Sequence, residues 1–287
     1  MRPLHHTNEN METLTPIHTR ELFPAIHAEL IGLLRGLDER DWARPTIARS
    51  WRVRDVVAHL LDGDLRKLSG GRDRQQLAAQ TVTSFTDIVD LINEMNAGGV
   101  SYAARLSPRV MTDLLEITGR WVSEYVATLA PHASARIAVA WAGEDRSENW
   151  MDTGREYTKR WHHQMQIRDA VGADGLLQRR WFYPVLDLSV RAFPRVYEKV
   201  SADVGTVVVF EVDAEGDNVW SVIRGASGWS VERGRSSNVA ACVRTDADTA
   251  WKLLYNALSV EAARARVTMT GNSTLTEPLL RARSVMV

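Results

Sequence analysis

The spacing of apolar residues changes along the chain, and this change constrains the fold more than any other feature of the sequence. In the first half, apolar residues recur every three or four positions, as in Leu22, Ile26, Leu30, Leu33, Leu34 and Leu37. From about residue 206, β-branched runs follow one another: TVVVFEVD, NVWSVIRG, GWSVERG and VAACVRTD. The first spacing is typical of amphipathic helices and the second of strands. The sequence therefore predicts an α+β chain, with helices first and an antiparallel sheet after them.

The length of 287 residues favours two domains, because one domain usually holds ~100–200 residues. We expect a disordered polar tail over residues 1–18, including His5-His6, then a helical bundle over 19–175 and an α+β domain over 176–287. Ser50 and Asp246 are predicted helix N-caps, and Pro108 is suited to the first turn of a helix. Gly70-Gly71 and Gly172 are predicted helix ends. The connectors AEGD, ASG and RSSN are typical of hairpins.

Composition narrows the classes of partner. The chain has 35 basic and 36 acidic residues, a net charge of −1, which gives no electrostatic reason to expect nucleic acid or an anionic membrane. No apolar run approaches the ~20 residues that span a bilayer, and the N-terminus lacks an apolar signal core. The single cysteine, Cys242, fits a reducing compartment and is expected to be a buried, inert thiol in a strand. We therefore expect a cytoplasmic protein that binds a small molecule.

Two positions, His59 and Asp64, stand out on the second predicted helix. His59 shares a polar stripe with Asp55, Asp62 and Arg66, which by itself is typical of a solvated helix face. Asp64 falls inside the apolar stripe of the same helix. A carboxylate in that place needs a partner, a cap or a site.

The stretch EYTKRWHHQMQIRDAVG, Glu156 to Gly172, places two adjacent histidines in a helix. At 100° per residue, Glu156, Lys159 and His163 share one side, and His162 lies about a quarter-turn away. The two histidines therefore cannot both point at one place. Spacing alone makes a weak case for metal, because a zinc site usually needs three or four ligands.

Two segments resemble a known family. SWRVRDVVAHLLDGDLRKLSGGRD is similar to the N-terminal domain of mycothiol-dependent maleylpyruvate isomerases, which are DinB-like metal-binding bundles, and WHHQMQIRDAVG resembles a later helix of that superfamily. VRTDADTAWKLLYNAL and the ending from Ala263 resemble the C-terminal, sterol-carrier-like domain of the same isomerases. The resemblance covers about residues 22–286. It implies an up-and-down helical bundle followed by a sterol-carrier-like α+β domain.

The resemblance also implies a divalent metal, zinc or nickel, held by three side chains. His59 and His163 match two of them, and Lys159 stands where the third is expected. Three alternatives follow: Glu156 reaches the metal, His162 does so after a local distortion, or the metal is absent and Lys159 pairs with Asp64 or Glu156. An altered site is favoured, because a protonated lysine repels a cation.

The implied activity is that of a metal-dependent isomerase or S-transferase that uses a low-molecular-weight thiol such as mycothiol. Arg160 or Arg168 would bind a substrate carboxylate. The alternative is a non-catalytic ligand-binding or regulatory protein, whose second domain offers an apolar pocket rimmed by Trp220, Trp229 and Trp251. These rings are more often ordinary core.

Overall fold

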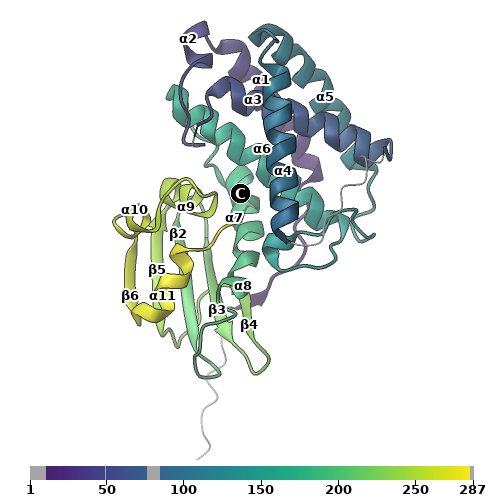
Figure 1. Cartoon of the computed structure of the whole chain (residues 1–287). Helices are drawn as coiled ribbons and strands as arrows, with labels where there is room; N and C mark the ends of the chain where they lie inside the picture. The colour runs from purple at the N-terminus through teal and green to yellow at the C-terminus, as the bar shows by residue number, and fades with distance from the viewer. Residues whose placement is uncertain (1–10, 49, 76–84, 285–287) are drawn as a thin grey trace, which may run out of the picture. The chain divides into compact units, whose positions relative to one another are not determined.

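The computed structural model describes residues 11–48, 50–75 and 85–284, which form two compact units (Figure 1). The helical unit holds residues 18–138 and 146–176. The sheet unit holds the chain through residue 17, residues 139–145 and the chain from residue 177. The His5-His6 pair lies outside the described residues.

The helical unit is built on the apolar stripes that the sequence predicts. Its helices are α1 (Phe23–Gly36), α2 (Glu39–Trp42), α3 (Val53–Arg66), α4 (Phe85–Ala103), α5 (Pro108–Thr128) and α6 (Asn149–Val171), with a short 3-10 turn at Arg20–Leu22. The predicted apolar set of α3 is buried throughout: Val53, Val56, Val57, Leu60, Leu61 and, just beyond the helix, Leu68. These side chains pack with those of α1, α5 and α6 in one hydrophobic core. α3 is therefore the central helix of the unit and carries His59 into its interior.

Several helix ends differ from the prediction. The N-cap of α3 is Arg52, not Ser50, and its backbone N–H donates to the Asp55 carboxylate at 2.9 Å. A π-helical turn, Lys67–Arg72, extends α3 through the predicted glycine end. Helix α6 begins at Asn149, earlier than the sequence indicates, because the polar residues of its first turns are buried and paired inside the unit. Pro108 does begin α5, capped by Ser107 as the hydroxyl accepts from the N–H of Val110.

The sheet unit contains a six-stranded sheet in the order β1-β4-β3-β2-β5-β6. Its strands are β1 (Glu12–Thr13), β2 (Val207–Asp213), β3 (Val219–Arg224), β4 (Trp229–Arg233), β5 (Ala241–Asp246) and β6 (Thr268–Gly271). Its helices are α7 (Arg179–Ser189), α8 (Phe193–Val196), α9 (Ala247–Leu254), α10 (Val260–Arg264) and α11 (Ser273–Leu280), with 3-10 turns at Ala140–Ala142 and Val190–Ala192. α9 and α11 pack on the strands β2 and β5, which places the core of this unit beneath them.

The pairing of β5 corrects the expectation of a wholly antiparallel sheet. β5 lies parallel to β2, with Phe210 opposite Val243, whereas the other strand pairs are antiparallel. The RSSN segment is therefore not a hairpin turn: after β4 the chain returns across the sheet to the far side of β2. This connection buries Ala241 and Val243 of β5 between two neighbouring strands.

The tail prediction is wrong for Glu12 and Thr13: Glu12 pairs with Arg233 of β4, and Thr13 pairs with Glu232. A strand of two residues pairs through its backbone and needs no apolar pattern of its own. The sequence therefore offers no local sign of this strand.

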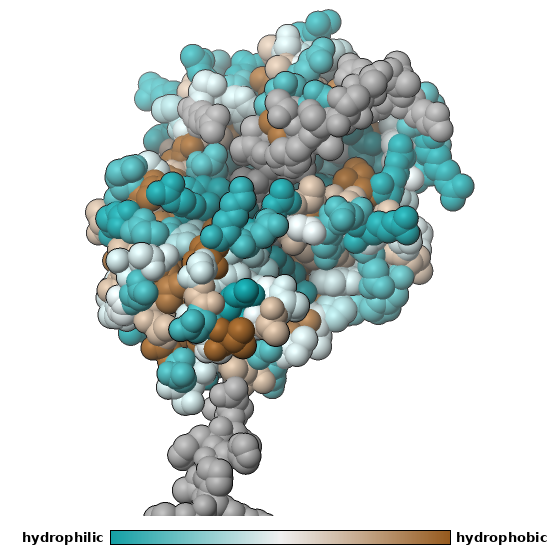
Figure 2. All heavy atoms as spheres, turned by 60° about the horizontal axis from the view of Figure 1, so that its bottom comes forward, coloured by the Kyte–Doolittle hydropathy of each residue, from teal (hydrophilic) through white to brown (hydrophobic). Residues whose placement is uncertain are grey.

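The tryptophans that were predicted to rim an apolar pocket mostly pack in the core of the sheet unit. Trp220 and Trp251 are fully buried, and the indole of Trp229 donates to the backbone oxygen of Val200 at 3.1 Å. Cys242 is only partly buried, contrary to the prediction. On the face drawn in Figure 2, hydrophobic residues lie in small groups among hydrophilic ones. Within the described residues, no helix has both the length and the apolar character needed to cross a bilayer.

Candidate functional site

His59 of α3 and His163 of α6 meet inside the helical unit. Their ring centroids lie 4.7 Å apart with the ring planes at 70°, and both residues are more than nine-tenths buried. The indole of Trp51 lies 5.0 Å from the His59 ring and 6.4 Å from the His163 ring, measured between centroids. We call these three residues the histidine cluster. The predicted convergence of His59 and His163 is thus observed, although they are separated by most of the unit's sequence.

Hydrogen bonds at Nδ1 indicate the tautomers of His163 and His162. His163 Nδ1 lies 2.8 Å from Gln166 Oε1, and His162 Nδ1 lies 3.0 Å from the backbone oxygen of Thr158. Both oxygens are acceptors, so each Nδ1 donates and each Nε2 keeps its lone pair. The rings of His162 and His163 are in contact, with centroids 3.9 Å apart, but His162 is hydrogen-bonded to the backbone of its own helix.

The histidines are held in the neutral form. Burial lowers the pKa of His59 and of His163 well below the usual 6.5, and the positive charge of Lys159 lowers both further. Burial and the neighbouring ring have the same effect on the pKa of His162. A neutral imidazole can accept a proton or a hydrogen bond, or bind a metal, through its unprotonated nitrogen.

Lys159 lies on the same side of α6 as His163, one turn earlier. Its ammonium packs against the backbone of Gly63 in α3, where a Cβ would overlap Nζ. Its Nζ is 3.6 Å from Glu156 Oε1. The pKa of Lys159 is lowered, because burial outweighs the opposing effect of the Glu156 carboxylate. Burial alone would raise the pKa of Glu156, but the surrounding cations, first among them Lys159, lower it well below its usual range. Glu156 is therefore an ionised partner of Lys159.

Asp64, the carboxylate inside the apolar stripe, has its partner on α6. The guanidinium of Arg160 forms a short ion pair with Asp64, and the Thr118 hydroxyl donates to the same carboxylate at 3.1 Å. Burial raises the pKa of Asp64, and the charge of Arg160 opposes this. The predicted alternative in which Lys159 pairs with Asp64 is therefore replaced by two pairs, Lys159 with Glu156 and Arg160 with Asp64.

Arg168, the second predicted substrate ligand, has several partners within the protein. Its guanidinium donates to the Gln164 side chain, to the backbone oxygen of Asp174 at 2.7 Å and to the Glu29 carboxylate at 3.2 Å. These contacts join the end of α6 to α1 and to the segment that follows Gly172.

The residues around the histidine cluster do not fit a three-ligand metal centre. Two imidazoles suit zinc, but the ammonium of Lys159 stands where the resemblance implies the third ligand. Glu156 is turned to its cations, with Arg155 Nη2 3.8 Å from one of its oxygens. In the part of the chain that the structure describes, no group of three or more His, Cys, Asp or Glu side chains is arranged to hold a metal ion.

Comparison with protein families decides the relationship. The model of the mycothiol maleylpyruvate isomerase N-terminal domain matches residues 23–171, just over half of the chain. The chain belongs to this family. The matched residues run from the first residue of α1 to the last residue of α6, so the family domain contains all the α-helices of the helical unit that the structure describes, and with them the histidine cluster.

Two solved structures show that the likeness of fold to the family extends beyond the helical unit. A crystal structure of the mycothiol-dependent maleylpyruvate isomerase has a TM-score of 0.50 at 13% identity, and that of a point mutant has a TM-score of 0.52 at 10% identity. Each comparison covers 88% of this chain and 91% of the other. A comparison with curated proteins gives no match. At these identities the structures establish the fold, a helical bundle with a sheet unit. They do not establish an activity, which has to be argued from the residues of the site.

Sequence reasoning missed three residues of the site. Trp51 precedes α3 and gave no periodic signal, although it closes over His59. Gly63 follows His59 by one helical turn, and a glycine in a helix interior is a sign of close approach by another group. Gln166 follows His163 by three residues, a spacing that places both side chains on one helix face.

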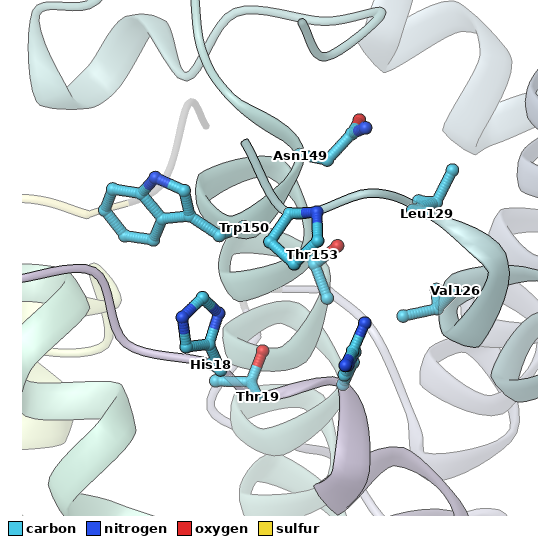
Figure 3. Close-up of a pocket in the computed structure, with 9 residues that line it drawn as sticks. His18, Thr19, Val126, Leu129, Asn149, Trp150 and Thr153 are labelled. Atoms are coloured by element: carbon cyan, nitrogen blue, oxygen red, sulfur yellow. The ribbon is translucent and has the colours of Figure 1, made fainter. Parts of the chain in front are cut away.

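A second hollow in the helical unit lies at the start of α6, where Asn149, Trp150 and Thr153 face His18 and Thr19 from the segment before α1 and Val126 and Leu129 from the end of α5 (Figure 3). Thr153 precedes His163 by ten residues, about 15 Å along the helix, so this hollow is separate from the histidine cluster.

Proposed function

We propose that the chain binds a low-molecular-weight thiol, such as mycothiol, at the histidine cluster and uses it for isomerisation or S-transfer on a small electrophilic substrate. The observation that carries the proposal is the contact of two neutral, buried imidazoles beside a lysine ammonium. Membership of the mycothiol maleylpyruvate isomerase family supports the choice of thiol. The two solved structures of similar fold are those of the mycothiol-dependent maleylpyruvate isomerase and a mutant of it.

The chemistry needs a thiolate near neutral pH. The Nε2 lone pair of His163 accepts the thiol proton, and the positive charge of Lys159 stabilises the thiolate that forms. The sulfur then bonds to an alkene carbon that is conjugated with a carbonyl group, and the π electrons move to the carbonyl oxygen. The remaining single bond rotates, the carbonyl re-forms, and the thiolate leaves. In S-transfer a leaving group departs with its electron pair instead. No step passes through a metal.

We assign positioning roles to the two arginines, in place of substrate binding. Arg160 neutralises Asp64 in the interior, and Arg168 ties the end of α6 to Glu29. A guanidinium already paired with a buried carboxylate is a poor ligand for a second one, because the first carboxylate would lose its partner.

A second candidate function is a non-catalytic binding protein on the same scaffold. Lys159 favours it, because this residue takes the position of a metal ligand. Such a protein would bind the thiol or an acidic ligand at the histidine cluster without turnover.

The test is thiol-dependent turnover by the purified full chain, with mycothiol and either maleylpyruvate or a chromogenic aryl halide. We expect turnover that needs the thiol and falls by about 100-fold or more in His163→Ala. The matched control is His132→Ala, an exposed histidine of the same unit, which should keep full activity. Calorimetric binding of the thiol without turnover selects the binding protein. If the chain shows no binding of the thiol and no turnover, both functions are refuted.

A further inference from the structure

The place of Lys159 depends on a gap in the neighbouring helix. Gly63 lies one turn after His59 on α3, and the Lys159 ammonium occupies the space that a side chain at position 63 would fill. The ammonium thus approaches the α3 backbone one turn from His59, while its own helix carries His163 one turn further on. Both helices therefore place the ammonium close to the two imidazoles.

The buried charges around this ammonium do not balance. Ion pairs link Lys67, Arg155, Lys159 and Arg160 to Asp64, Asp152 and Glu156 in a single network. Four cations face three carboxylates, which leaves one positive charge in excess among the described members.

Lys159 is the cation with the weakest partner in that network. Its separation from Glu156, 3.6 Å, exceeds hydrogen-bonding distance, whereas Lys67 and Arg155 lie 2.8 Å and 2.7 Å from Asp152. Glu156 is also shared with Arg155 and Arg160. The excess positive charge therefore resides mainly at the Lys159 end, beside the histidine cluster.

A buried positive charge determines whether the site favours anionic or cationic ligands. It repels a divalent cation that the Nε2 lone pairs would otherwise hold, and it attracts a carboxylate or thiolate. We infer that Lys159 supplies the positive charge of this site from within the chain, so that the histidine cluster excludes divalent metal and binds the anionic end of a small ligand. This inference concerns ligand class and holds whether or not thiol transfer is the reaction.

The first experiment measures zinc bound per chain by atomic emission after incubation with Zn²⁺ and removal of the excess. The wild type and the exposed charge-reversal control Lys199→Glu should retain almost none. Lys159→Glu places a carboxylate one turn before His163 and should retain about one zinc per chain, which is lost again when His59→Ala is added. If Lys159→Glu does not fold, Lys159→His makes the same test with a neutral ligand.

The second experiment measures the binding of maleate, a small dicarboxylate, by calorimetry. Lys159→Gln removes the charge and should weaken maleate binding by about tenfold or more, while Lys199→Gln should not change it. Any of three results overturns the inference. The first is about one zinc per wild-type chain that is lost in His59→Ala, and the second is that Lys159→Glu and Lys159→His both fold and retain no zinc. The third is an affinity for maleate that Lys159→Gln leaves unchanged. Turnover is not measured, so loss of the proposed activity leaves this test intact.

Discussion

Removal of Asp64 should destabilise the helical unit more than removal of its partner Arg160. Both side chains are almost fully buried, at 2% and 3% exposed, and they form one ion pair across α3 and α6. Asp64→Ala leaves a buried guanidinium that cannot lose its proton, with the Glu156 carboxylate 3.9 Å away as its remaining ion-pair partner. The expected loss in free energy of unfolding is about 3–5 kcal/mol.

Arg160→Met has a milder consequence, because the remaining group can become neutral. Burial already raises the pKa of Asp64 and the charge of Arg160 is the largest influence that opposes this rise, so loss of the arginine favours the protonated carboxyl group. The Thr118 hydroxyl remains as a hydrogen-bond partner. The expected cost is about 1–3 kcal/mol.

Urea unfolding of the full chain, followed by far-ultraviolet circular dichroism, measures both losses in the transition of the helical unit. The control is Arg109→Ala on α5, because Arg109 is 92% exposed and 3.9 Å from Asp113; its midpoint should stay nearly unchanged. An Asp64→Ala loss below about 1 kcal/mol, or a larger loss for Arg160→Met than for Asp64→Ala, would refute the reasoning from buried charge.

Two further predictions concern the same unit. Because surrounding cations lower the pKa of Glu156 below 4.5 in the folded state, its stabilising effect is present above that pH and is lost as the pH falls. The difference in unfolding free energy between wild type and Glu156→Gln should therefore narrow from pH 6 towards about pH 3.5, and a difference that widens contradicts the ion pairing. Gly119→Ala should cost about 1–3 kcal/mol, because its Cβ would overlap the His27 ring packed from α1. Gly32→Ala, which meets open space, should be neutral or stabilising, and equal effects of the two substitutions in thermal unfolding would exclude the close contact.

The order of helices and strands is largely readable from the sequence. The apolar stripe of α3, the start of α5 at Pro108 and the Asp246 cap of α9 were predicted and are observed. These features depend on interactions within one or two helical turns, or on the regular spacing of apolar residues. Both can be recognised from residues that are close together in the sequence. Family membership also follows from local motifs, because the family match covers the two motif segments of the helical unit, apart from the last residue of the second.

The sequence alone left the partners of the charged residues open. It offered Lys159 as a partner of either Asp64 or Glu156 and did not pair Asp64 with Arg160. Nor could it place the Gly63 backbone beside an ammonium 96 positions away. It also suggested a hairpin between β4 and β5, where the chain instead returns to β2. Such pairings depend on which helix faces and strand edges meet after collapse, and many pairings satisfy the same local pattern. The sequence by itself determined a histidine on each of two helices; the tertiary structure decided that a lysine, held in a glycine gap, lies beside them.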